Sequence, residues 1–299
     1  MSSDHAATIA LTGPLAAIGR TTLAVVSYLG GIALLSISAA KAVVRPSRQA
    51  SGLLGAMAGQ WAWLLGAGIP LVGLVHASIG SFLAMQAYYG ATFAEATGPV
   101  VGVGMFRNLA PLLSGFVMAG LLAGRLTPEL RRSSLLGLDD DPTWRPDREV
   151  ARGIRPDPRT PPEPARLVAV RLLAAAAAGP ILAFWGGTLG TLVGLLVAKS
   201  MIGLPAPIFL GKMLEMLWAR DVVGLVFKGA AFGFLAALFA CFEGLRRHLD
   251  DGPEAVANAA FRAACLSLIA ILVVNMAWFL LFYQAGPAFG PTVLTPPTP

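Results

Sequence analysis

The sequence FRNLAPLLSGFVMAGLLAGRLTPEL, from Phe106 to Leu130, is a long apolar segment with polar residues at both ends. Arg107 and Asn108 precede the apolar part, and Glu129 lies near its other end. About 20 consecutive apolar residues are enough for a helix to cross the hydrocarbon core of a bilayer. The segment is therefore predicted to be a membrane-spanning helix whose functional groups lie at its ends.

The composition of the whole chain agrees with a membrane protein. Of its 299 residues, 56% are hydrophobic and only 13% are charged, and the mean hydropathy is +0.70. Soluble domains carry about 25% charged residues. The basic residues, which give a net charge of +6, lack the interleaved aromatic residues of a nucleic-acid-binding surface, so no nucleic-acid partner is expected. We predict an all-α integral membrane protein.

About five transmembrane helices are predicted, at residues 61–85, 106–130, 166–198, 222–244 and 262–283. A further apolar run at 23–40 is rich in serine and glycine, so we expect it to lie along the membrane interface, with a sixth spanning helix as the alternative. The stretch 205–220 is amphipathic and predicted to be a surface helix. The glycines at 186, 190 and 194 are spaced to admit a second helix closely, from this chain or from another.

Three regions follow from this pattern. Residues 1–50 are expected to form a cytoplasmic or interfacial helix region, residues 51–290 a polytopic membrane domain, and residues 291–299 a proline-rich tail. The segment 131–164 is rich in proline and arginine, which predicts a cytoplasmic loop outside the bilayer. Cytoplasmic segments of membrane proteins are rich in lysine and arginine. The positions of these residues therefore predict a cytoplasmic N-terminus and a C-terminus outside the cytoplasm.

The sequence carries no recognisable catalytic set. The motifs G-x-x-x-x-G-K-[ST], G-x-S-x-G and H-E-x-x-H do not occur, so no enzymatic activity is expected and ATP must be hydrolysed by a partner. The histidines His5, His76 and His248 are far apart, and Cys241 and Cys265 have no metal-ligand spacing, so no metal or other cofactor is expected. His76 lies at membrane depth and is interpreted as a packing residue rather than a functional ionisable group.

Several short motifs resemble, in order and spacing, those of the MlaE/YrbE-type permeases, the membrane subunits of ABC transporters that move lipids together with MCE proteins. The family pattern R-E-L-G-P-V-L corresponds to R-N-L-A-P-L-L here, and the family's A-E-L-G to P-E-L-R. The likeness covers about residues 50–285. The matching stretches are 107–113, 119–120, 129–130, 221–228 (D-x-x-x-x-x-x-K), 232–233 (F-G), 241–244 (C-x-x-G) and 252–258.

The resemblance implies a permease subunit in a bacterial inner (cytoplasmic) membrane. Its expected partners are a separate ABC ATPase, an MCE-domain protein, a second permease copy or paralogue, and membrane lipid. It also implies a lipid path near Met85, Gln86, Arg107, Asn108 and Pro111. The Arg107 guanidinium would there bind a lipid phosphate, and a snorkelling interfacial anchor is the alternative.

On the other side of the membrane, the resemblance implies that Glu129, Leu136, Gly137 and Asp139 face the ATPase, with an ordinary cytoplasmic helix end as the alternative. The chain also departs from the family, which has Glu at position 108, Arg at 121 and Gly at 131. A proline- and arginine-rich insertion interrupts the coupling segment.

Two explanations of these departures stay open. The chain is a divergent half of a heteromeric permease pair, or it has lost ATPase coupling. A non-transporting membrane scaffold is the alternative function.

Overall fold

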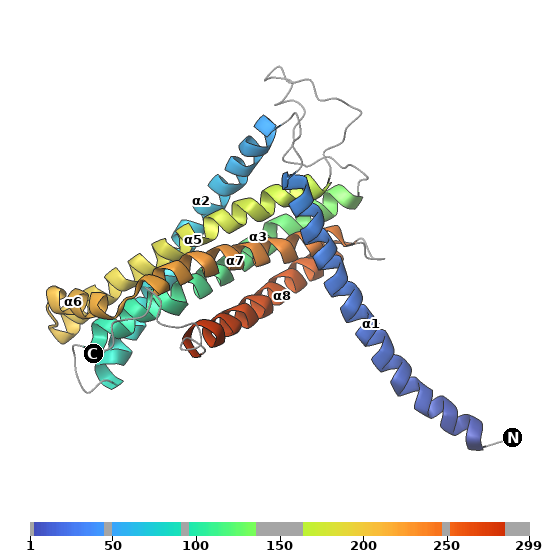
Figure 1. The fold of residues 1–299 in the computed structure, drawn as a ribbon, viewed down its shortest axis with the longest axis horizontal. Helices are drawn as coiled ribbons and strands as arrows, with labels where there is room; N and C mark the ends of the chain where they lie inside the picture. The colour runs from blue at the N-terminus through green and yellow to red at the C-terminus, as the bar shows by residue number, and fades with distance from the viewer. Residues whose placement is uncertain (1–2, 45–49, 91–95, 136–163, 247–251, 285–299) are drawn as a thin grey trace.

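The computed structural model describes residues 3–44, 50–90, 96–135, 164–246 and 252–284, and these residues form helices without any strand (Figure 1). The all-α prediction is confirmed. In chain order the elements are α1 (Ser3–Val44), α2 (Ala50–Gly90), η2 (Pro99–Val103), η3 (Met105–Leu109), α3 (Ala110–Leu135), α5 (Pro164–Val197), η4 (Ala198–Ile202), α6 (Ala206–Met216), α7 (Ala219–Leu245), α8 (Pro253–Phe279) and η5 (Leu280–Gln284).

Six segments of the described chain are long and apolar enough to cross a membrane. They are Ala17–Val43, Gly55–Gly90, Pro99–Arg131, Arg166–Ile202, Ala219–Leu245 and Pro253–Phe282. The last five correspond to the five predicted spans, whose bounds they extend at most ends; the last segment begins nine residues earlier than predicted and ends one residue earlier. The protein is therefore a multi-pass membrane protein.

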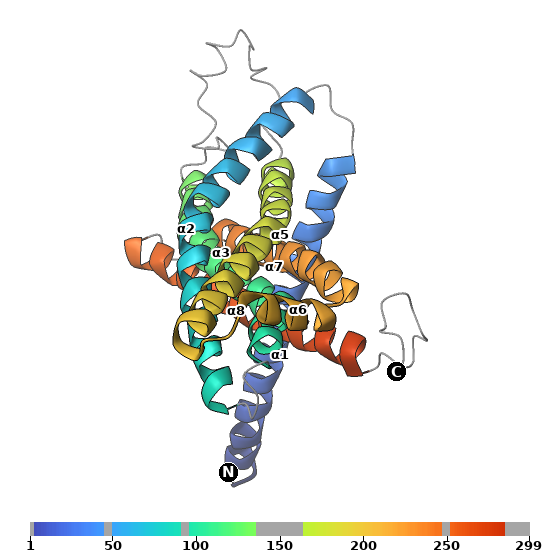
Figure 2. The ribbon, with the colours of Figure 1, turned by 90° about the vertical axis from the view of Figure 1, so that its left-hand side faces the viewer.

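Helices α2, α3, α5, α7 and α8 run side by side as a bundle (Figures 1 and 2). Helix α5 packs against α2 and α7, and α7 packs in addition against α3 and α8. The short helix α6 lies at one end of this bundle and α1 crosses the other end (Figure 1). We call these the α6 end and the α1 end.

Helix α1 crosses the bundle instead of running along it (Figures 1 and 2). Its apolar segment, Ala17–Val43, has a mean hydropathy of 2.0. Only 6% of the most apolar 18-residue stretch within this segment is buried inside the protein. Length and composition alone would allow it to span a membrane. The interfacial placement of residues 23–40 and the sixth span both stay predictions.

Glycines bring α2 and α5 into close contact. A Cβ atom at Gly80 would lie 1.9 Å from the carbonyl oxygen of Gly190, and one at Gly194 would lie 3.0 Å from the carbonyl oxygen of Gly80. One at Gly186 would meet the imidazole ring of His76 at 2.7 Å. Small residues allow such backbone contact between membrane helices. The predicted glycine ladder thus packs within the chain.

Several boundaries differ from the sequence prediction. Helix α3 continues to Leu135, so residues 131–135 of the predicted loop are helical. The π-helical turns of η4 end at Gly203, whose φ of 73° is the left-handed conformation that commonly ends a helix. Helix α6 lies inside the predicted surface helix, while Arg220 already belongs to α7.

Candidate functional site

Arg107, in the π-helical segment η3, forms an ion pair with the first turn of α7. Its Nε lies 2.9 Å from Oδ1 of Asp221 and its Nη2 lies 3.0 Å from Oδ2. The Asp221 side chain is fully buried, whereas 30% of the Arg107 side chain is exposed. Two parallel hydrogen bonds between a guanidinium and a carboxylate are stronger and more directional than a single contact. Arg107 is therefore oriented by α7.

Asp221 and Lys228 hold Arg107 from two positions on α7. Asp221 Oδ2 also accepts the backbone N–H of Trp218 at 3.1 Å, at the N-terminus of α7 where negative charge is favoured. Two turns later, the buried Lys228 donates its Nζ to the Arg107 carbonyl oxygen. The D-x-x-x-x-x-x-K spacing therefore places both residues on one face of α7. We call Arg107, Trp218, Asp221 and Lys228 the Arg107 cluster.

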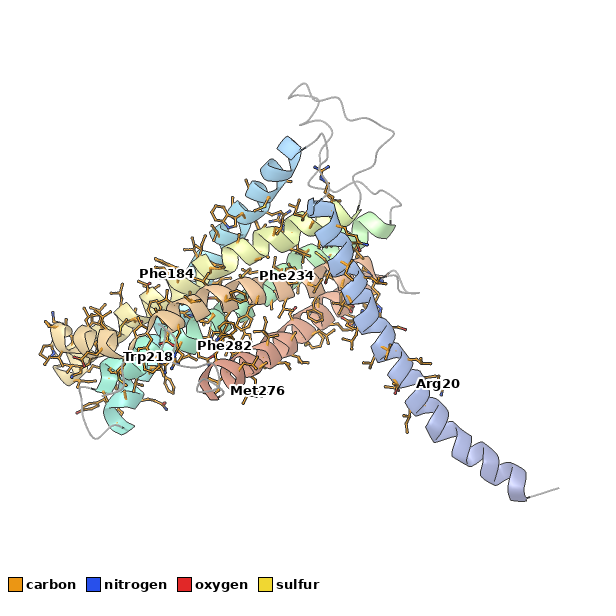
Figure 3. The ribbon with its side chains drawn as sticks, in the orientation of Figure 1. Arg20, Phe184, Trp218, Phe234, Met276 and Phe282 are labelled. Carbon is orange, nitrogen blue, oxygen red and sulfur yellow. The ribbon has the colours of Figure 1, made fainter. Side chains whose placement is uncertain are left out.

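Trp218 completes this cluster at the α6 end of the bundle (Figure 3). The Arg107 guanidinium carbon lies 5.7 Å from the centre of the Trp218 ring, and the Arg220 guanidinium carbon lies 3.9 Å from it. Cations within about 6 Å of an aromatic face are attracted to it. The cluster combines a buried carboxylate, a buried ammonium and a partly exposed guanidinium.

The other predicted lipid-path residues lie on three elements: Met85 and Gln86 on α2, Asn108 on η3 and Pro111 at the start of α3. Gln86 is exposed, Met85 and Asn108 are half-buried, and Pro111 is buried. Their role in a lipid path stays a prediction.

At the α1 end, Glu129 is held by arginines from two helices. Its Oε1 lies 2.8 Å from Nε of Arg125, one turn earlier on α3, and its Oε2 lies 3.7 Å from Nη2 of Arg171 on α5. The Arg125 guanidinium carbon lies 4.1 Å from the ring centre of Trp63 on α2. Glu129 is 22% exposed. The remaining predicted coupling residues, Leu136, Gly137 and Asp139, lie outside the described residues.

Arg131 has a structural role that sequence reasoning missed. Its side chain is 2% exposed, and its Nη1 donates to the carbonyl oxygen of Arg246, 3.3 Å away, at the C-terminus of α7. Cationic side chains stabilise the last carbonyls of a helix. The bond joins residues 115 positions apart and ends on the main chain, so no local motif signals it.

His76 bridges α2 and the start of α3. Its Nδ1 lies 2.7 Å from the Val72 carbonyl oxygen, and its Nε2 lies 3.3 Å from that of Ala110. The side chain is fully buried, in agreement with its interpretation as a packing residue. Within the described part of the chain, no three His, Cys, Asp or Glu residues are grouped as a metal site, and Cys241 and Cys265 are free thiols.

Comparison with known proteins gives a consistent result. The chain matches the family described as Permease MlaE over residues 57–131 and 162–281, more than half of its length, and the gap between these ranges falls on the predicted loop insertion. A probable ABC transporter permease protein of Rickettsia felis is 25% identical over 272 residues, which cover 89% of this chain and 96% of the relative.

Two further relatives match over shorter regions. A probable ABC transporter permease protein of Synechocystis is 28% identical over 201 residues, covering 67% of this chain and 69% of the relative. The chloroplastic protein TRIGALACTOSYLDIACYLGLYCEROL 1 of Arabidopsis thaliana is 22% identical over 192 residues, covering 64% of this chain and 50% of the relative. The chain belongs to the MlaE family of ABC transporter permeases.

Proposed function

We propose that the chain is the permease subunit of an ABC-type lipid transporter that works with a separate ATPase and an MCE-domain protein. The observation that carries this proposal is the family match, which covers parts of all five helices of the bundle. The plant relative is named for a glycolipid, which supports a lipid as the transported substance.

The charge distribution supports an orientation with the α1 end in the cytoplasm. Arginines gather at this end, and cytoplasmic segments of membrane proteins carry an excess of lysine and arginine. The sequence has ten arginines between residues 125 and 171 and three more at 246, 247 and 262. Within the described chain, the α6 end carries five basic residues, namely Arg107, Lys199, Lys212, Arg220 and Lys228. In this orientation, Glu129 faces the side on which an ATPase would bind, and the Arg107 cluster faces the side of the MCE partner. The proposed membrane is the bacterial inner membrane, as the family resemblance implies for such a permease.

Arg107 is the proposed contact for a lipid phosphate. Its partial exposure and its fixed orientation support this role, because a guanidinium already held in place loses little freedom on binding. The ion pair changes the design of the test. Replacing Arg107 alone would leave the buried Asp221 carboxylate without its guanidinium partner, and loss of one partner of a buried ion pair costs about 3–5 kcal/mol of stability. The informative variant is Arg107→Ala combined with Asp221→Asn.

The test is copurification of the full chain with an ABC ATPase and an MCE-domain protein of the same organism, followed by measurement of bound phospholipid. A stable assembly that contains lipid is expected, and absence of ATPase association would refute the transport mechanism. The double variant is expected to lower lipid occupancy while the assembly stays intact. Lys199→Ala, which removes an exposed cation of η4, is the matched control and should leave occupancy unchanged.

One observation favours the scaffold as a second candidate. The family match stops between residues 131 and 162, where the coupling segment is expected. A scaffold would bind soluble partners through this region without lipid turnover. Lipid-dependent ATP hydrolysis by the assembly would exclude the scaffold, and its absence in an assembly that still forms would favour it.

A further inference from the structure

A second buried carboxylate, Glu243, lies near the C-terminus of α7 and takes no part in the contacts described above. Its side chain is 0% exposed. An ionised carboxylate is retained in a protein interior only where charged or hydrogen-bonding partners compensate for the lost water. The partners of Glu243 therefore indicate what it does.

These partners come from three separate places in the chain. The Tyr28 hydroxyl of α1 donates to Oε1 at 2.9 Å, and Nε of Arg262 on α8 donates to Oε2 at 3.1 Å. Nη1 of Arg246, the residue after α7, lies 3.8 Å from Oε1. We call Tyr28, Glu243, Arg246 and Arg262 the Glu243 cluster. One carboxylate thus connects α1, α7 and α8.

The aromatic ring of Tyr28 is held as well as its hydroxyl. It meets Phe242 edge to face with 4.9 Å between ring centres, and the Arg246 guanidinium carbon lies 5.2 Å from the Tyr28 ring centre. A Cβ atom at Gly31 would lie 2.8 Å from the Phe242 ring, so the absence of a side chain there lets α1 approach α7. Tyr28 is fixed by packing and by a charge-assisted hydrogen bond together.

Other polar side chains of α1 bond to their own helix. The hydroxyls of Thr21, Thr22 and Ser36 each donate to the carbonyl oxygen four residues earlier. Ala39 adds a buried apolar contact at the C-terminal part of the helix. The part of α1 around Arg20 extends beyond the bundle (Figure 3). The position of this extended part depends on the bond of Tyr28 and on the apolar packing that follows it in α1, where Ile32, Leu35, Ala39 and Ala42 contact the core.

We propose that Glu243 is a positioning residue that latches α1 to α7 and α8 through Tyr28 and Arg262. When the Tyr28 bond to Glu243 is intact, α1 lies across the end of the bundle. When it is broken, α1 swings away while the helices of the bundle keep their mutual packing. This inference goes beyond the proposed function and does not depend on it.

The test measures the position of α1 directly. Nitroxide labels are placed on cysteines introduced at the exposed positions Leu23 of α1 and Leu192 of α5, with the two native cysteines replaced by alanine. Electron–electron distances are then recorded for the full chain in phospholipid nanodiscs. Tyr28→Phe removes only the hydroxyl and is expected to raise the ratio of displaced to latched α1 about ten-fold, the value of one hydrogen bond to a charged group.

Glu243→Gln is expected to displace α1 in the same direction. The amide NH₂ group is a donor, so it cannot accept a hydrogen bond as the carboxylate oxygen did. The double variant should be displaced no further than Glu243→Gln alone, since Glu243→Gln already disrupts the bond that Tyr28→Phe removes. Tyr89→Phe and Glu215→Gln, at exposed positions away from the cluster, are the controls and should keep the original distances.

Unchanged distances in Tyr28→Phe and Glu243→Gln would overturn the proposal. Additive displacement in the double variant would also overturn it, because the two residues would then act separately. Should Glu243→Gln fail to fold, Tyr28→Phe decides alone, since it keeps the ring contacts with Phe242 and Arg246.

Discussion

Replacement of Gly80 by alanine is expected to force α2 and α5 apart. The added Cβ would lie 1.9 Å from the Gly190 carbonyl oxygen, 2.7 Å from its carbonyl carbon and 2.9 Å from its Cα. All three atoms belong to the main chain, so no side-chain rotation can relieve the contact. To reach ordinary contact at 3.4 Å, the two helices must separate locally by about 1.5 Å, which also weakens neighbouring dispersion contacts.

The expected magnitude is a balance of two effects. Overpacking a well-packed interior costs about 1–3 kcal/mol, and the backbone contact places Gly80→Ala at the upper limit. Alanine recovers about 0.5–1 kcal/mol relative to glycine within a helix. The net expectation is a loss of about 2 kcal/mol in the free energy of unfolding.

Gly66, on the same helix, supplies the control. Nothing lies within 4 Å of a Cβ at this position, so Gly66→Ala should gain about 0.5–1 kcal/mol from helix propensity alone. In the assay, the purified chain is unfolded in detergent and its unfolding is monitored by tryptophan fluorescence. Equal midpoints for the two variants would refute the assignment of Gly80 to a direct backbone contact with α5.

Three further substitutions test the polar clusters by the same unfolding assay. Asp221→Asn should cost about 3 kcal/mol, because Arg107 loses its ionised partner; a cost below 1 kcal/mol would contradict the buried ion pair. Lys228→Met should cost about 1–3 kcal/mol through the lost bond to the Arg107 carbonyl, and no change would contradict that bond. Arg131→Gly should lower the free energy of unfolding by about 1–2 kcal/mol, because the C-terminus of α7 loses its cationic cap. The surface control Lys199→Ala should change the free energy of unfolding by no more than about 0.5 kcal/mol.

The spans could be predicted because the length of an apolar run is a local property of the sequence. The placement of α1 could not be predicted, because the composition of residues 23–40 suits both an interfacial and a spanning helix. Its packing against the bundle rests on contacts such as that between Tyr28 and Glu243, which are 215 residues apart and therefore invisible in the local sequence.

Partners of polar residues were less predictable than the residues themselves. The spacing of Asp221 and Lys228 indicated a shared helix face, but not that this face would hold Arg107, 114 residues earlier. The Arg125 and Glu129 pair is different, because an i, i+4 spacing implies contact on one helix. The family has arginine at the position of Leu121, and in this chain the Arg125 guanidinium lies one helical turn later. The glycine ladder likewise indicated close approach without naming α2 as its partner.

The distribution of burial separates a packed body from two peripheral helices. About half or more of the apolar windows of α3, α5 and α7 is buried inside the protein (50%, 61% and 50%), against 6% for α1 and 11% for α8. Rearrangements are therefore expected to move α1 or α8 before they disturb the body, because these helices have the fewest contacts to lose.

Both peripheral helices bond to Glu243, in addition to the packing of α1 against α5 and of α8 against α3 and α7. Helix α3 is joined to α7 by the Arg131 bond to Arg246 at the same end. A cycle that moves the peripheral helices must break or carry along the bonds of Glu243. One that moves α3 past α7 must break the bond of Arg131 instead. The effects of Glu243→Gln and Arg131→Gly on transport therefore identify which of the two motions occurs.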